Sequence, residues 1–185
     1  LLASKHYGER MAQHWLDVVR YADTAGFAND WERPNAWRYR DYVIRSFNAD
    51  KPYDRFVMEQ LAGDEIAPGD RDALIGTMYL RHWIYEWNQR DVEGQWAEIL
   101  SDITETTTDV FLAMSMKCAR CHDHKFDPLL QKDYYELVSF FSPLLPREEV
   151  PLADVSLRTE HYQQQQLWES ATENLRRELH AIEQP

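Results

Sequence analysis

The only two cysteines of the chain lie three residues apart, in the segment Cys118-Ala119-Arg120-Cys121-His122. On one turn of helix, residues three and four apart share a face, so both thiols can reach the two vinyl groups of one porphyrin. The adjacent imidazole of His122 can then turn to the iron as its proximal ligand. This spacing is typical of c-type haem attachment. We therefore expect one covalent haem c, anchored by Cys118 and Cys121 and ligated by His122.

Three other interpretations of these residues stay open. A thioredoxin-like dithiol needs a strand before the motif, whereas the preceding pattern is that of a long helix. A zinc site can be assembled from Cys118, Cys121, His122 and His124, although adjacent Cys and His side chains rarely point at one tetrahedral centre. A plain disulfide or two buried thiols would leave both histidines unexplained. Haem is the interpretation that accounts for the whole motif.

The sixth position of the haem iron decides between electron transfer and catalysis. His14 is a candidate distal ligand, and Asp17 on the same helix is placed to orient its imidazole. A helix-surface or hydrogen-bonded core histidine explains His14 equally well. Asp17 and Arg20 are also candidate acid–base groups beside an open haem site, together with His14.

Other residues offer weaker distal ligands. His124 follows His122 by two residues, too near in sequence to reach the opposite haem face easily, and a second-shell or propionate role suits it better. Four methionines lie on apolar helical faces, where Met usually fills gaps in the core. These are Met58, Met78, Met114 and Met116.

The elements that must position the motif follow an apolar spacing of three to four residues. This spacing predicts helices over residues 4–21, 37–48, 56–61, 71–86, 96–116, 134–141 and 168–182. Gly63 is expected to end the third of them in a left-handed C-terminal cap. The alternation of apolar and polar residues that is typical of a strand never extends over more than a few residues of the chain. The predicted fold class is all-α, a multi-helix domain around a covalently bound haem, with a C-terminal amphipathic helix.

The composition limits which domain organisation and which classes of binding partner are expected. The 185 residues are 44% hydrophobic, enough for a core, and the net charge of −12 argues against nucleic-acid binding. No run of eighteen apolar residues exists, so we expect no membrane span. Residues 1–142 form the expected haem-binding domain, 143–157 a linker loop, and 158–185 an amphipathic helix that leads to a further part of a longer protein.

Several long motifs resemble one known family. The motif at 118–128 (CARCHDHKFDP) and the segment 131–135 (QKDYY) are similar to the planctomycete-specific cytochrome-like family. The same resemblance holds for residues 7–10, 14–17, 20–23, 35–42, 50–53 and 59–64. It covers most of residues 1–141, whereas the Trp-rich stretch 79–95 fits the pattern poorly. The resemblance implies a haem cofactor and an exported protein, and it implies no particular reaction.

The leading hypothesis is a monohaem c-type cytochrome domain that carries single electrons within a larger exported protein. Its expected partner is a redox protein or an adjacent cytochrome domain. The first alternative is a haem enzyme with an open distal site that acts on peroxide or oxygen. The second is a binding module with a structural haem. Because thioether formation is catalysed on the exported side of the bacterial membrane, we expect a periplasmic or otherwise exported domain, with a signal sequence outside this chain.

Overall fold

The computed structural model describes residues 2–86, 90–147, 150, 152 and 155–183. Within these ranges the elements are helical, and the only extended pairing is an isolated antiparallel bridge between Thr24 and Glu32. The chain divides into two compact units, residues 1–146 and 147–185. The predicted all-α fold class is therefore confirmed for the described part of the chain.

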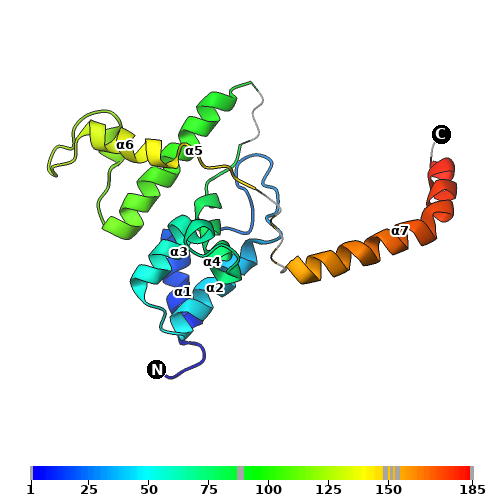
Figure 1. Ribbon diagram of the computed structural model, residues 1–185. Coiled ribbons are helices and arrows are strands. Elements are labelled where there is room, and N and C mark those ends of the chain that lie inside the picture. The colour runs from blue at the N-terminus through cyan, green and yellow to red at the C-terminus, as the bar shows by residue number, and fades with distance from the viewer. Residues whose placement is uncertain (1, 87–89, 148–149, 151, 153–154, 184–185) are drawn as a thin grey trace. The chain divides into compact units, whose positions relative to one another are not determined.

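The first unit begins with two helices that pack against each other, α1 (Tyr7–Val18) and α2 (Ala36–Asn48) (Figure 1). Gly8 permits their close approach, because a Cβ atom there would lie 2.4 Å from the backbone oxygen of Ile44. The helix predicted over residues 4–21 is shorter than expected. It ends before Arg20, whose φ of 60° places it in the left-handed region and turns the chain away.

Gly63 does not form a left-handed cap. It lies inside α3 (Tyr53–Ile66), directly after a kink at Ala62, whose φ of −152° and ψ of 33° are not helical, and α4 (Arg71–Gly76) packs against α3. A Cβ atom at Gly63 would lie 2.0 Å from the backbone oxygen of Ala73, so only glycine allows this contact. The prediction of a left-handed cap was wrong because a glycine needed for close approach and a glycine needed for a turn look alike in one sequence.

The helix predicted over residues 71–86 is also interrupted. After α4 the chain tightens into a 3-10 helix, η1 (Thr77–Arg81), and then leaves helical geometry. The backbone N–H of Tyr85 donates to the backbone oxygen of Ala25 at 2.9 Å, and Trp83 is buried in a cluster with Leu100, Ile103 and Phe141. These long-range contacts replace the helical hydrogen bonds that the local pattern predicted.

Two further helices cross to form the part of the unit that carries the cysteine motif, α5 (Val92–Thr107) and α6 (Gln131–Phe141) (Figure 1). Trp83, Leu100, Ile103 and Phe141 form the buried cluster between them. The helix predicted over residues 96–116 ends early. It passes into a π-helical turn, η2 (Thr108–Leu112), and then reverses at Ala113, whose φ is 51°.

Two sets of polar contacts inside the first unit join α1 to α2 and α3, and η1 to α5. The indole Nε1 of Trp15 donates to the hydroxyl of Tyr39 at 3.1 Å, and that hydroxyl donates in turn to the side-chain oxygen of Gln60. The hydroxyl of Tyr79 lies 3.0 Å from that of Thr107 on α5. Among the described side chains, each buried nitrogen or oxygen atom has a hydrogen-bond partner, so these contacts help to hold the helices in one arrangement.

The second unit is the single helix α7 (Val155–Glu183). Its apolar positions Trp168, Leu175 and Leu179 recur at the spacing that predicted an amphipathic helix. Residues 148–149, 151 and 153–154 of the predicted linker lie outside the described residues. Across the described ranges, no helix has the length and hydrophobicity needed to cross a membrane.

Candidate functional site

The cysteine motif occupies one tight turn. Residues Lys117–Arg120 form a 3-10 helix, η3, and the backbone N–H groups of Cys121 and His122 both donate to the oxygen of Cys118, at 3.2 and 3.4 Å. Ala119 is fully buried against Tyr134, so it anchors the turn to α6. Both cysteines are free and exposed. The two thiols therefore lie on one accessible turn of backbone.

The His122 imidazole is held in one tautomer. Its Nδ1 lies 2.8 Å from the backbone oxygen of Asp123. A carbonyl oxygen can only accept, so Nδ1 carries the hydrogen and Nε2 keeps its lone pair. The side chain is exposed. This is the arrangement in which a histidine binds a metal through Nε2 while a backbone oxygen fixes the ring.

His124 is used differently. Its Nδ1 accepts hydrogen bonds from the backbone N–H groups of Asp127 at 2.9 Å and Phe126 at 3.4 Å. The same nitrogen lies 3.1 Å from a carboxylate oxygen of Asp127, but since a backbone N–H can only donate, Nδ1 is an acceptor and this contact is not a hydrogen bond. The side chain is only 12% exposed. His124 therefore shapes the loop that follows the motif.

The zinc interpretation receives no support from this geometry. In residues 2–86 and the later described ranges, no three Cys, His, Asp or Glu side chains gather as ligands for a metal ion. Nδ1 of His124 is also occupied by backbone donors, which leaves it unable to bind an ion. The residues present instead suit a c-type haem: two free thiols for the vinyl groups and one preoriented imidazole for the iron.

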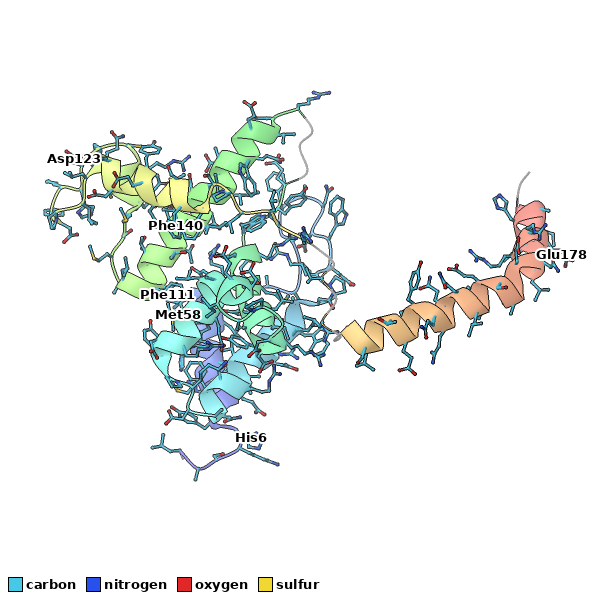
Figure 2. All side chains as sticks on the ribbon, in the orientation of Figure 1. His6, Met58, Phe111, Asp123, Phe140 and Glu178 are labelled. Carbon is cyan, nitrogen blue, oxygen red and sulfur yellow. The ribbon has the colours of Figure 1, made fainter. Side chains whose placement is uncertain are left out.

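The start of α6 holds the motif in place. A carboxylate oxygen of Asp123 accepts from the backbone N–H of Gln131 at 2.8 Å, and Figure 2 shows Asp123 beside this end of α6. The side-chain amide of Gln131 and the hydroxyl of Tyr135 both donate to the backbone oxygen of Arg120, at 3.2 and 3.0 Å. Asp133 caps the helix by accepting from the N–H of Leu130. The segment 131–135 thus supports the residues on both sides of Cys121.

Charged groups frame the turn. Arg120 donates two hydrogen bonds to the carboxylate of Glu98 on α5, at 2.6 and 3.2 Å. This pairing raises the pKa of Arg120 and lowers the pKa of Glu98. The side chain of Glu98 is 68% exposed, so the pair contributes little to stability. It connects the turn between the two cysteines to α5.

Sequence reasoning missed two groups beneath the motif. The hydroxyl of Tyr134 lies 3.4 Å from a carboxylate oxygen of Glu105, and burial raises the pKa of both side chains. The ammonium of Lys117 lies 3.9 Å from Glu105. Tyr134 belongs to the family-like segment 131–135, but nothing in the Thr-rich sequence around Glu105 indicates that the two meet.

The candidate distal residues lie elsewhere. His14 and Asp17 are exposed on α1. Arg20 forms an ion pair with Asp102 on α5, so its charge is already matched. In the part of the chain that the structure describes, no hydrogen bond, ion pair or ring contact joins these three residues to the motif. The structure therefore does not assemble them with Cys118, Cys121 and His122 into one site.

The methionines also separate. Met116 is buried under the motif against Ala119 and Tyr134, where it fills the core as its type suggests. Met114, two residues earlier, is 36% exposed, and Met58 on α3 is 45% exposed. The expectation of a core position is thus confirmed for Met116 and wrong for Met58 and Met114, while Met78 is half-buried.

Comparison with known proteins finds a matching family model. The family model PSCyt2, described as a protein of unknown function (DUF1549), matches residues 1–145. These residues include the whole cysteine motif and all of the segments that carry the resemblance noted above. No curated protein and no solved structure matches the chain. The family description assigns neither a cofactor nor a reaction.

Proposed function

We propose that this chain, which belongs to the PSCyt2 family of unknown function, is a monohaem c-type cytochrome domain that carries single electrons within a larger exported protein. The observation that supports this most directly is the exposed turn with two free thiols beside an imidazole whose Nε2 is left to bind iron. Neither a structural disulfide nor a buried core thiol requires that combination.

The proposed attachment uses groups that the fold leaves accessible. Cys118 and Cys121 would hold the haem through thioether bonds, which form by addition of each S–H across one vinyl double bond and therefore need no oxidant. His122 would ligate the iron through Nε2, while the backbone oxygen of Asp123 accepts from its Nδ1. When bound, haem c supplies a reversible one-electron couple.

The exposed position of the motif also bears on the role. With both thiols and His122 at the surface, one edge of the group would lie where a second protein can approach. This favours electron exchange with a redox partner or an adjacent cytochrome domain. The alternative of a haem enzyme requires acid–base groups at the site, and the proposed ones, His14, Asp17 and Arg20, have no described contact with the motif. Attachment in the periplasm, or an equivalent exported compartment, follows from the thioether chemistry.

The test is to express the chain in a bacterial periplasm together with the c-type maturation proteins. We expect a protein that stays coloured after denaturation and acid extraction, and whose mass exceeds that of its amino acids by one haem. The Cys118→Ser/Cys121→Ser variant should lose the group, whereas the matched Ser139→Ala variant on α6 should retain it. A wild-type protein whose mass equals its amino acids alone would overturn the proposal.

A spectrum of the reduced protein then separates electron transfer from catalysis. Low-spin α and β bands that carbon monoxide does not change indicate a six-coordinate, electron-transferring haem. A high-spin species that binds carbon monoxide indicates an open site and the enzymatic alternative. Replacing His14 with Ala changes this spectrum only if His14 is the distal ligand.

A further inference from the structure

A second surface feature lies apart from the cysteine motif, between α2 and α4, two helices that pack against each other (Figure 1). It is an open pocket of about 340 Å³, which we name the α2–α4 pocket. This volume is at the lower end of the range that small-molecule sites occupy. Its lining residues are Trp37, Arg38, Arg45, Arg71, Asp72 and Ile75.

The pocket is positive in an acidic protein. Three guanidinium groups and one carboxylate line it, whereas the chain as a whole carries a net charge of −12. Asp72 accepts from a terminal nitrogen of Arg45 at 2.7 Å, which matches one of the three charges. No described side chain forms a hydrogen bond or ion pair with Arg71. Two positive charges therefore remain without a counter-ion in this hollow.

Other arginines of α2 and α3 are matched by carboxylates. Arg40 pairs with Asp41, and Arg55 pairs with Glu59. A single surface arginine is well solvated and needs no partner, but like charges gathered in one concave site raise the local concentration of anions. The grouping of Arg38, Arg45 and Arg71 is therefore the arrangement expected of a site for a negatively charged ligand.

The same pocket presents apolar surface. The ring of Trp37 is 42% exposed, and the guanidinium of Arg38 lies 4.5 Å from its centroid. This contact holds the guanidinium over the indole, while Arg38 Nε donates to Asn35 at 3.1 Å. Ile75 is 5% exposed and contributes an apolar lining on the α4 side. A ligand here meets both cationic donors and a flat hydrophobic surface.

We propose that the α2–α4 pocket binds an organic anion in which a carboxylate, sulfate or phosphate group is joined to a flat apolar body. The anionic group contacts Arg38 and Arg71, the two guanidinium groups of the pocket that no carboxylate matches, since guanidinium groups match the geometry of such oxyanions. The apolar body packs on Trp37. This inference is independent of the haem proposal, because the pocket and the motif share no residue.

The test follows the indole N–H signal of Trp37 in the 185-residue chain by nuclear magnetic resonance, with Trp37→Phe to assign it. The probes are naphthalene-2-carboxylate, naphthalene-2-sulfonate and 2-naphthyl phosphate, each compared with uncharged naphthalene-2-methanol. We expect saturable binding of at least one anion and much weaker binding of the alcohol. The order among the three anions identifies which oxyanion the pocket prefers.

Two variants make the result specific. Arg71→Gln should weaken binding of the preferred anion about tenfold, the effect of losing one charge-assisted hydrogen bond. Arg10→Gln, which removes an exposed arginine of α1, should leave it unchanged. Because Arg71 is exposed and has no described partner, its replacement should not alter the circular dichroism spectrum. Equal binding by the two variants, equal binding of the alcohol, or no saturation below about 10 mM would each overturn the proposal.

Discussion

Replacing Glu59 with Gln tests the buried polar contacts that hold α2 and α3 together. Glu59 is 4% exposed, and three side chains donate to its carboxylate. Tyr42 donates to Oε2 at 2.8 Å and Arg55 to Oε1 at 2.6 Å, while the ammonium of Lys51 also contacts Oε2. Burial alone would raise the pKa of Glu59, but these hydrogen bonds outweigh it and hold the pKa below its ordinary value.

The magnitude follows from which contacts Gln can keep. Its amide oxygen still accepts from one donor, whereas its NH₂ group faces a cation and cannot accept. Lys51 is only 18% exposed, so it loses its counter-charge largely out of water, while Arg55, at 38%, can turn to solvent. Breaking a buried ion pair costs about 3–5 kcal/mol, and the partial exposure of Arg55 lowers the expected loss here to about 3 kcal/mol.

Urea unfolding followed by circular dichroism measures this loss. The matched control is Glu136→Gln on α6, which removes an exposed glutamate paired with Lys132 four residues away and should change the free energy of unfolding by less than about 0.5 kcal/mol. Because the pKa of Glu59 is depressed on folding, its stabilisation is present above the ordinary glutamate range and is lost as the pH falls through the folded pKa. The difference between wild type and Glu59→Gln should therefore stay constant above the ordinary glutamate pKa of 4.5 and shrink as the pH falls below it.

Two results would refute this reasoning. One is a loss at neutral pH no larger than that of the Glu136→Gln control, which would mean that the burial of Glu59 adds nothing to its ion pairs. The other is a difference in unfolding free energy between wild type and Glu59→Gln that stays constant as the pH falls. Only the wild type carries a carboxylate at this position, so its protonation must change that difference.

Three further predictions concern other parts of the first unit. Gly63→Ala should lower the melting temperature, because the new Cβ would lie 2.0 Å from the backbone oxygen of Ala73, and overpacking of this kind costs about 2 kcal/mol; an unchanged melting curve would contradict it. Burial and then the neighbouring arginines lower the pKa of His82 to about 3 from its usual 6.5, so the free energy of unfolding measured in urea should fall as the pH drops below about 6.5, by at most ~1.4 kcal/mol per pH unit, and His82→Gln should flatten that profile. Asp123→Ala removes the carboxylate that accepts from Gln131 but keeps the backbone oxygen that fixes the motif histidine, so unfolding measurements should show a loss of about 1 kcal/mol and mass spectrometry should show that haem attachment persists.

The errors in element boundaries share one cause. Apolar periodicity identified the helices of the first unit because their buried residues recur on one face, but it did not show where neighbouring backbone interrupts them. Gly63 lies within α3 because α4 crosses there, and the helix expected over residues 71–86 stops at Arg81 because Trp83 is drawn into the cluster beside α5. Both facts depend on contacts between residues that are distant in sequence, and a single sequence does not show which distant residues are in contact.

By itself, the sequence determined the all-helical class and the candidate motif, since helical spacing and the separation of Cys118 from Cys121 are local properties of the chain. Only the tertiary structure decided which way these groups face. Burial of Ala119 against α6 leaves both thiols outside, and the hydrogen bond from His122 to Asp123 selects the nitrogen that can bind a metal. Orientation depends on packing and hydrogen bonds between elements, and these exist only once the helices have met.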